Sequence, residues 1–355
     1  MFNNYFLLPS NIKVIKNDLK YKSKNKLKYN SDLGYDYIEL YVLDKNNNIK
    51  LSEVIKLSND NLLKKVSLKY SNLRERISKI HQTREEIPSL FRGNQPKIMG
   101  ILNITKDSFY DGGKYFNTSK AIDQAYKLIK EGADIIDVGG ESTRPGSLAI
   151  PPKEELDRVF PVVQELCKNN INVSCDTRNS LTMQKVLDEG VKIINDVSGL
   201  NYDKNSLNVI KKYNCYYVLM HSVKTPADMQ INPKYQNVIS EIYDFFLEKI
   251  NIMKEIKINT SKIIIDPGIG FGKNDNHNFQ ILKYLSIFLD LGLPVLIGLS
   301  RKSFIGRFIK NEKEDRLPCS ISLALDSFLK GSSFIRVHDV KATKEAINIF
   351  KKANN

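Results

Sequence analysis

The sequence contains few cysteines, and they lie far apart. Only four occur among 355 residues, none in a C-x-x-C pair and none with a histidine at metal-site spacing. This scarcity excludes a disulfide framework and is typical of buried free thiols in a reducing compartment. No apolar run reaches the ~18 residues that a membrane-spanning helix needs. The first residues, MFNNYFLLPSNIK, lack a basic region ahead of their apolar patch, so we expect no signal peptide and a cytoplasmic location.

Positive charge is in excess. The chain holds 54 Lys and Arg against 40 Asp and Glu, a net charge of +14, which raises the question of nucleic-acid binding. The excess is spread along the chain: residues 1–95 carry +8 (18 − 10) and the rest +6 (36 − 30). The basic tail 1–30 has little aromatic interleaving and no known motif. An RNA-binding role is therefore the weaker alternative, and a steep salt dependence of RNA affinity would reveal it.

The first 95 residues are polar, rich in lysine and weakly patterned. Residues 35–44, YDYIELYVLD, alternate as a strand does, and DKNNN at 44–48 predicts a turn. Residues 71–86 have the apolar spacing of an amphipathic helix. The polar run RGNQP at 92–96 marks a boundary. We expect a small α+β extension over 1–95, of unknown role, packed on the remainder of the chain or at a subunit interface.

From residue 96 onward, short apolar runs alternate strictly with helical patterns. Eight such units in about 260 residues match a (β/α)₈ TIM barrel of ~250 residues, and the apolar runs suit strands covered on both faces. An open doubly wound sheet is the alternative, but the count and the lack of a glycine-rich dinucleotide loop favour a barrel over 96–355. The expected strands are 97–103, 134–140, 172–177, 192–197, 216–221, 263–268, 294–299 and 334–339. The expected helices are 119–131, 153–169, 180–189, 204–213, 235–257, 276–289, 318–330 and 342–353.

Polar residues stand at the end of every expected strand. In a barrel these ends meet on the C-terminal face, where active sites are built. A buried strand that ends in a charge is costly unless the charge is paired or faces a ligand. One such ending could be a helix cap, but eight are hard to explain as caps alone. In chain order they are Asn103; Asp137 and Glu141; Asp176; Asn195 and Asp196; His221; Asp266; Ser300, Arg301 and Lys302; and Arg336, His338 and Asp339.

Eight longer stretches, one at each strand end, carry a family resemblance. Any one is modest evidence, but eight in the right order are specific. They are MGILNITKDSFYDGG (99–113), GADIIDVGGESTRPG (132–146), SCDTRNS (174–180), INDVSGL (194–200), MH (220–221) with PADMQ (226–230), IIDPGIGFGK (264–273), GLSRKSFIG (298–306) and RVHDV (336–340). With these motifs the chain resembles the dihydropteroate synthases over residues 97–353, and residues 1–95 lie outside the resemblance.

The resemblance implies a pocket for a dihydropterin ring. A pterin is flat and presents a row of donors and acceptors, so carboxylates can accept from its N–H groups while an amide serves a mixed edge. Taken alone, Asp176 could equally cap the helix expected from Ser180, and Asn195 with Asp196 could form a turn. By similarity to the family, the pterin residues are Asp176, Asn195, Asp266 and Lys302.

A second set is suited to an anion. Arg336 and His338 alternate across a strand end, so both can point at the barrel mouth, and arginine binds phosphate in a bidentate manner. By resemblance they hold the diphosphate of the substrate with Asn103, which also ligates Mg²⁺. An amide oxygen with phosphate oxygens and water suits this hard cation. GIGFGK (268–273) lacks phosphate-loop spacing, so we predict no nucleotide site there.

Two loops, 105–115 and 139–147, flank the predicted mouth. In the family they fold over the aromatic amine, 4-aminobenzoate, whose sulfonamide analogues target these enzymes. One departure from the family pattern stands here: Lys106 replaces a proline, which frees the loop and adds charge. The residues placed near the amine by resemblance are Phe109, Asp111, Thr143, Arg144, Pro145 and Ser303.

The resemblance implies dihydropteroate synthase activity, an alkyl transfer of folate biosynthesis. Its catalytic residues would be Asp176, Asp266, Lys302, Arg336 and His338. The expected partners are small-molecule substrates and a second copy of the chain, with no nucleic acid and no membrane. The nearest alternative is the methyl-tetrahydrofolate-binding module of corrinoid methyltransferases, which would not need SRKS (300–303) or RVHD (336–339). A fused pathway kinase is excluded because residues 1–95 are too short and show no phosphate loop.

Overall fold

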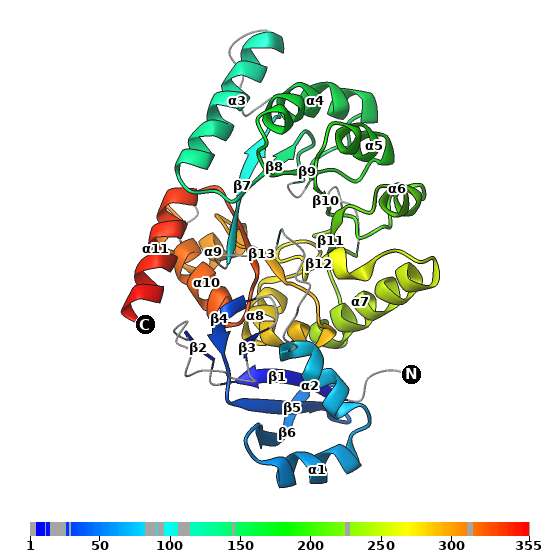
Figure 1. The fold of residues 1–355 in the computed structure, drawn as a ribbon, viewed down its shortest axis with the longest axis vertical. Helices are drawn as coiled ribbons and strands as arrows, with labels where there is room; N and C mark the ends of the chain where they lie inside the picture. Colours follow the sequence, from blue (N-terminus) through cyan, green and yellow to red (C-terminus); the bar gives the residue numbers. More distant parts are fainter. Residues whose placement is uncertain are drawn as a thin grey trace.

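The computed structural model consists of a barrel ringed by helices and a smaller unit packed against its flank (Figure 1). The smaller unit, coloured blue, is formed by the N-terminal residues. The structure describes residues 5–10, 12–14, 26–27, 30–81, 90, 96–105, 114–143, 146–223, 228–310 and 315–354.

Eight parallel strands form the barrel, and strands that are neighbours in the chain are neighbours in the sheet. β7 pairs with both β8 and β14, and a parallel bridge between Ile265 and Val295 joins the two ends of the sheet into a ring. The predicted TIM barrel is confirmed. The strands are β7 (Lys97–Asn103), β8 (Ile135–Gly139), β9 (Val173–Asp176), β10 (Ile193–Asp196), β11 (Tyr216–Met220), β12 (Ile263–Asp266), β13 (Leu296–Gly298) and β14 (Phe334–Val337).

Helices cover the outside of the barrel. They are α3 (Lys114–Lys130), α4 (Pro152–Lys168), α5 (Ser180–Asp188), α6 (Ser206–Tyr213), α7 (Val238–Glu255), α8 (Asp275–Lys283), α9 (Ser303–Phe308), α10 (Leu317–Leu329) and α11 (Val340–Ala353). The helix predicted over 276–289 is divided: α8 ends at Lys283, and the 3₁₀ helix η3 (Leu285–Leu291) follows. A second 3₁₀ helix, η2 (Thr260–Lys262), precedes β12. Among the described residues, no helix has both the length and the apolar character needed to cross a bilayer.

The barrel interior changes from apolar to polar along the strands. Side chains alternate between the two faces of a strand, so the residue two positions on from an interior residue is also interior. Apolar residues form a layer at the strand starts, closed by Leu90: Met99, Ile135, Ile193, Val218, Ile264, Leu296 and Phe334. Two positions further on stand polar residues: Asp137, Asn195, Asp266 and Arg336. The apolar layer therefore supports a polar one at the C-terminal ends.

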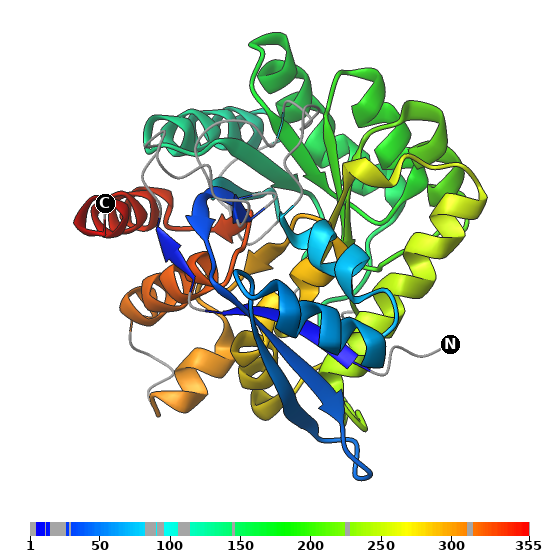
Figure 2. The same ribbon diagram turned by 60° about the horizontal axis from the view of Figure 1, so that its bottom comes forward.

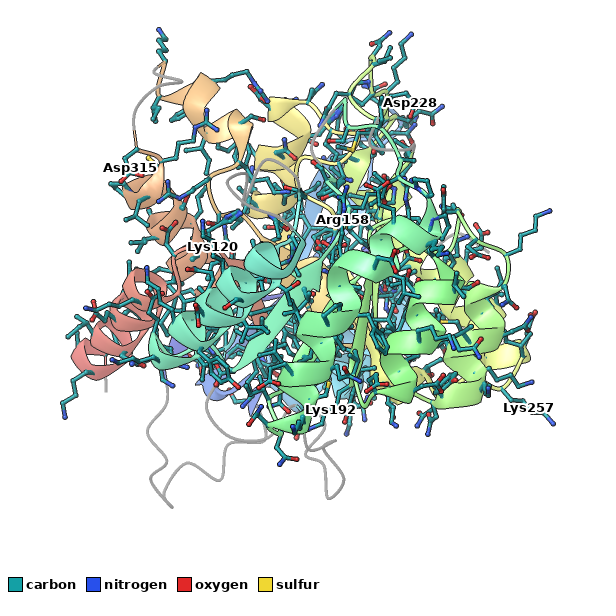
Figure 3. The ribbon with its side chains drawn as sticks, turned by 90° about the horizontal axis from the view of Figure 1, so that it is seen from above. Lys120, Arg158, Lys192, Asp228, Lys257 and Asp315 are labelled. Carbon is teal, nitrogen blue, oxygen red and sulfur yellow. The ribbon has the colours of Figure 1, made fainter. Side chains whose placement is uncertain are left out.

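Figure 3 shows the barrel from the side and separates its two ends. Asp228 and Asp315, which follow strands β11 and β13, lie toward one end. Lys192 and Lys257, which precede strands β10 and β12, lie at the other. The loops after the strands therefore gather at one end, as the barrel topology requires.

The N-terminal extension is an α+β unit, as predicted. One antiparallel sheet has the order β1-β5-β6 and a smaller one the order β2-β4-β3. Its elements are β1 (Tyr5–Ser10), β2 (Lys13–Val14), β3 (Lys26–Leu27), β4 (Asn30–Gly34), β5 (Tyr37–Leu43), β6 (Ile49–Lys56), α1 (Asp60–Lys69) and α2 (Leu73–His81). The predicted strand appears as β5, and the predicted turn at 44–48 joins it to β6, with Asn47 at a positive φ of 58°. The predicted helix 71–86 appears as α2, and residues 82–86 lie outside the described ones.

A buried cation ties the extension to the barrel. Arg76 of α2 donates from Nε to Asp290 of η3 over 3.0 Å and from Nη2 to the Tyr243 hydroxyl of α7 over 3.1 Å. It also donates to the Tyr5 carbonyl, and the Leu7 N–H donates to the Asp290 carboxylate. The Arg76 and Asp290 side chains are 9% and 0% exposed. Figure 2 shows the extension lying across this flank of the barrel.

Candidate active site

Four side chains from four strands meet inside the C-terminal end of the barrel. Arg336 on β14 donates from Nε to Asp137 Oδ2 on β8 over 2.6 Å, and from Nη2 to Asp176 Oδ2 on β9 over 2.7 Å. Asn195 on β10 donates from Nδ2 to the same Asp137 oxygen over 3.0 Å. The cluster thus joins one cation, two carboxylates and one amide where the polar interior layer begins.

Asp176 belongs to this cluster and not to a helix cap. Burial raises the pKa of its carboxyl to about 7, although the Arg336 guanidinium opposes that rise. At the start of helix α5 it is Asp203 that accepts a backbone hydrogen bond, from the Ser180 N–H to Oδ2 over 2.8 Å. The alternative that Asp176 caps this helix is therefore wrong.

Asn195 and Asp196 point to opposite faces of β10. Asp196 accepts from the Ser198 N–H over 2.7 Å and from the Tyr217 hydroxyl over 2.6 Å. The predicted turn is thus made by Asp196, outside the barrel, whereas Asn195 faces the interior. Because side chains alternate along the strand, Asn195 joins the interior cluster and Asp196 stabilises the turn outside it.

Asp266 and Lys302 lie close to the cluster from the opposite side of the barrel. Asp266 Oδ1 accepts from the Gly268 N–H over 2.7 Å, and burial raises the pKa of this carboxyl while that bond and Lys302 oppose the rise. Burial lowers the pKa of Lys302 to about 8, with Asp266 and Asp176 opposing and Arg336 assisting the fall. Lys302 Nζ lies 4.4 Å from the centre of the Phe271 ring. Acidic and basic groups therefore lie close together at this end of the barrel.

A buried lysine fixes the loop that follows Asp266. Lys273 Nζ contacts His221 Nδ1 at 2.9 Å and donates to the carbonyls of His221 and Phe271 over 3.2 and 2.9 Å. Burial lowers the pKa of both Lys273 and His221. Gly268 stands against the same backbone, since a β-carbon there would lie 2.1 Å from the His221 carbonyl oxygen. Only glycine fits at this position.

His338 and Asp339 follow directly after the end of β14. His338 Nδ1 lies 3.1 Å from the Ser300 hydroxyl. The protein around the ring removes part of its hydration, and Arg336 adds a like charge, so the pKa of His338 lies below its ordinary value. Asp339 accepts two hydrogen bonds from Arg301, over 2.8 and 2.7 Å. His338 is thus held at the mouth, and Asp339 is occupied by an ion pair.

Asn103 is the one predicted metal ligand. Its amide oxygen lies beside Gly139: a β-carbon built on that glycine would be 3.5 Å from Asn103 Oδ1 and 3.4 Å from Asp176 Cβ. The glycine therefore leaves room between Asn103 and the cluster. Within the described ranges, no group of three or more His, Cys, Asp or Glu side chains could hold a metal. Substrate oxygens and water can supply the other ligands of a cation held by one amide oxygen, as they often do for Mg²⁺.

A buried ion pair anchors the loop after β8. Arg178 donates to both oxygens of Glu141 over 2.9 and 2.8 Å, and its guanidinium lies 4.0 Å from the Tyr202 ring centre. The Ile150 N–H also donates to Glu141. Both ends of the segment between Glu141 and Ile150 are thereby held near the strand that carries Asp176.

The residues predicted at the amine site are only partly described. Thr143 is half-buried in the loop after β8, and Ser303 is exposed at the start of α9. Four others lie outside the described residues, as does Lys106: Phe109, Asp111, Arg144 and Pro145.

The structure brings the predicted ring and anion residues into one region. Sequence reasoning noted Asp137 and His221 at strand ends but gave them no role, and it missed Lys273. The signal for Asp137 was its place in IIDVG, where it stands two positions after an interior isoleucine. No periodicity marks Lys273, because it lies in a loop and becomes buried only through its tertiary contacts.

Comparison with known proteins gives a consistent family. A family model described as "Pterin binding enzyme" matches residues 99–338. A curated dihydropteroate synthase of Haemophilus influenzae is 40% identical over 262 residues, covering 73% of this chain and 94% of the relative. One from Neisseria meningitidis serogroup B is 42% identical over 265 residues, covering 73% and 93%.

Solved structures resemble the barrel closely. A Clostridium difficile dihydropteroate synthase with pteroic acid has a TM-score of 0.68 and 40% identity, covering 74% of this chain and 97% of that one. A Xanthomonas albilineans enzyme with 4-aminobenzoic acid has a TM-score of 0.68 and 38% identity, covering 73% and 93%. A Yersinia pestis enzyme with a sulfonamide drug has the same two values and covers 73% and 94%.

Proposed function

The chain belongs to the dihydropteroate synthases, a family of pterin-binding enzymes, and from this premise we propose that its barrel condenses 6-hydroxymethyl-7,8-dihydropterin diphosphate with 4-aminobenzoate. The products are 7,8-dihydropteroate and diphosphate. The chain is thus a transferase of folate biosynthesis. The family resemblance read from the motifs is confirmed.

The observation that carries the proposal is the cluster of Asp137, Asp176, Asn195 and Arg336, with Asp266 and Lys302 beside it. Buried acceptors of this kind suit the N–H edge of a flat heterocycle. His338 lies in the bend directly after β14, two positions beyond Arg336, and we propose that an anion attached to the ring reaches both. Ring acceptors and anion donors thus lie side by side.

The reaction breaks the bond between the pterin methylene carbon and a diphosphate oxygen and forms a bond from that carbon to the amine nitrogen. The leaving oxygen keeps the bonding electron pair, and the amine supplies the pair for the new bond and then loses one proton. The dihydropterin ring can delocalise positive charge on the methylene carbon. A weakly nucleophilic aromatic amine therefore needs only to capture a cation, and no covalent enzyme intermediate is required.

We assign Asp176, Asn195, Asp266 and Lys302 to the ring. The two carboxylates accept from ring N–H groups and stabilise the positive charge that develops there, while Lys302 donates to the ring carbonyl or a ring nitrogen. Acceptors already fixed by the barrel do not have to reorganise as the charge appears.

We assign Arg336, His338 and Asn103 to the leaving diphosphate. A guanidinium has five N–H donors, and the contacts to Asp137 and Asp176 use two of them. The other donors can bind phosphate oxygens while both ion pairs stay in place. Arg336 can therefore pull on the leaving group without releasing the carboxylates.

Mg²⁺ is the proposed cofactor, with Asn103 as its protein ligand. Its single amide oxygen, the space beside Gly139 and the lack of a carboxylate cage among the described residues suit a cation that arrives with the diphosphate. When bound, the cation would neutralise charge on the diphosphate oxygens. The chain's own residues hold the ring and exclude water from it.

The amine site belongs to the loops after β7 and β8. We propose that Phe109, Asp111, Thr143, Arg144, Pro145 and Ser303 bind 4-aminobenzoate, and that sulfonamides compete there. Support comes from relatives solved with 4-aminobenzoic acid and with a sulfonamide drug. The ion pair of Glu141 and Arg178 would hold the second loop in place over the mouth.

Three further assignments complete the proposal. Residues 96–355 form the catalytic domain, and residues 1–95 form an appended unit. The enzyme works in the cytoplasm, consistent with free cysteines among the described residues. It works as a homodimer, as the family resemblance implies.

The test is an assay of diphosphate release with dihydropterin diphosphate, 4-aminobenzoate and Mg²⁺, each omitted in turn. Release that requires the pterin substrate and is accompanied by dihydropteroate supports the proposal. Full turnover by Arg336→Ala would remove the leaving-group role of this arginine. Methyl-tetrahydrofolate binding without any diphosphate release would favour a corrinoid methyltransferase module instead.

A further inference from the structure

Asp137 is a carboxylate with no exposed surface in the middle of β8. Its Oδ2 accepts from Arg336 Nε and Asn195 Nδ2, whereas its Oδ1 has no hydrogen-bond partner among the described residues. Asp137 therefore touches one residue assigned to the anion and one assigned to the ring. Because Asp137 is fully buried, its two hydrogen bonds connect it directly to both sets of residues.

The contact with Asn195 fixes which way the amide faces. A carboxylate offers only acceptors, so the group that meets Asp137 Oδ2 at 3.0 Å must be the NH₂ and not the carbonyl of the amide. Turning the amide around would bring two acceptors together at a buried site, where their repulsion is costly. The Asn195 oxygen is therefore directed away from Asp137.

This orientation decides what Asn195 offers to a ring. One of its two N–H bonds is used by Asp137, so the ring meets the carbonyl oxygen and the remaining N–H. That pair suits an edge with a donor next to an acceptor, as on the pyrimidine side of a pterin. The same carboxylate holds Arg336 through Nε over 2.6 Å, which restricts the orientation of the guanidinium.

We propose that Asp137 is a positioning residue that sets the donor and acceptor pattern of Asn195 and aligns Arg336. It acts through these two residues and touches no substrate atom. The inference rests on the proposed function of the barrel and adds a determinant of pterin specificity to it.

Two variants separate the role of the contact from the role of the charge. Asp137→Leu has a similar size and removes every acceptor, so Asn195 can turn and Arg336 loses one anchor. Asp137→Asn can place its carbonyl where Oδ2 stands and its NH₂ where the unpartnered Oδ1 stands, so it keeps both contacts. We expect KM for dihydropterin diphosphate to rise about tenfold or more in Asp137→Leu but within about threefold in Asp137→Asn. KM for 4-aminobenzoate should change little in either.

Ser174→Ala is the matched control. Ser174 is paired in register with Asp137 on the adjacent strand, is equally buried, and has no hydrogen-bond partner for its hydroxyl among the described residues. Its removal should leave both KM values unchanged. A double-mutant cycle with Asn195→Ala adds a second readout: in that background Asp137→Leu should cost clearly less pterin affinity than it does alone.

The outcomes divide clearly. An unchanged pterin KM in folded Asp137→Leu, equal losses in the Leu and Asn variants, or additive losses in the cycle would each overturn the inference. If Asp137→Leu does not fold, Asp137→Ser takes its place, since its hydroxyl is too short to reach both partners. Wild-type enzyme with no diphosphate release would instead contradict the proposed function, so the two failures are distinguishable.

Discussion

Arg336 and Asp176 are joined by a hydrogen bond of 2.7 Å from Nη2 to Oδ2. The cation assigned to the leaving group therefore also balances a carboxylate assigned to the ring. Any change at one of these two residues must alter the electrostatics of the other. The ring and anion sites should accordingly behave as one unit when pH or sequence is changed.

The first prediction concerns the pH dependence of kcat/KM for the pterin substrate. The pKa of Asp176 is about 7 and that of Lys302 about 8. Below pH ~7 Asp176 takes up a proton and loses its charge, and above pH ~8 Lys302 loses its proton and donates less well. We expect a narrow bell-shaped profile with its maximum between these values, measured from pH 5.5 to 9.5.

Lys302→Arg is the control for the alkaline limb. A guanidinium stays charged across this range, so the alkaline limb should disappear while the acid limb remains near pH 7. A limb that persists unchanged in Lys302→Arg, or a flat profile between pH 6 and 9 in the wild type, would contradict the assignment.

The second prediction concerns the ion pair between extension and barrel. Arg76→Met leaves the fully buried Asp290 carboxylate without its cation, and breaking such a pair typically costs about 3–5 kcal/mol of unfolding free energy. Denaturant titration should show this loss, while kcat of the folded enzyme changes little because no active-site residue is involved. Lys69→Met, which removes an exposed pair with Glu53, should leave the free energy of unfolding almost unchanged.

The third prediction concerns acid stability. His221 is buried, and burial keeps its pKa well below the ordinary 6.5. Just below pH 6.5 this side chain therefore stays neutral in the folded protein but takes up a proton in the unfolded chain. The free energy of unfolding should therefore fall as pH drops below ~6.5, by up to about 1.4 kcal/mol per pH unit from this group. His221→Gln, which keeps an acceptor for Lys273, should show a shallower fall between pH 6.5 and 5. An identical slope in the variant would exclude His221 as the source.

The fourth prediction concerns Gly268, at φ +70°. Gly268→Ala should lose more than the ~1–2 kcal/mol that positive φ costs an L-residue, because its β-carbon would meet the His221 carbonyl oxygen at 2.1 Å. It should also weaken pterin binding, since the Gly268 N–H holds Asp266. Gly190→Ala, at φ +99° with nothing within 4 Å, isolates the backbone cost. Equal unfolding free energies for the two variants would show that the close approach is relieved.

The interior residues of the barrel are predictable from the sequence, because two regularities suffice. Alternation along a parallel strand identifies the interior face, and the strand ends all meet at one end. Asp266 and Arg336 follow in this way, each two positions after an apolar interior residue. The pairing of Arg336 with Asp137 does not follow, because the two are 199 positions apart and meet only when the barrel closes.

The elements of the extension are harder to predict from the sequence than those of the barrel. Strand β6, IKLSEVIK, is an edge strand with several exposed positions, so its sequence need not alternate strongly. Helix α1 buries only Val66, which leaves a weak helical signal. Strand β6 packs against β5 and helix α1 packs against β6, and local patterns of apolar residues do not record such contacts.

The contact of Arg76 with Asp290 predicts how a truncated chain that lacks the N-terminal extension would behave. A chain begun at residue 96 would retain the described side chains of the mouth. Asp290 would lose the Arg76 cation and the Leu7 N–H, the surface of η3 under β1 and α2 would become exposed, and Leu90 would no longer close the apolar layer of the barrel. We expect such a fragment to retain activity at low temperature and to aggregate when it is warmed. The extension would therefore contribute to stability and solubility more than to kcat.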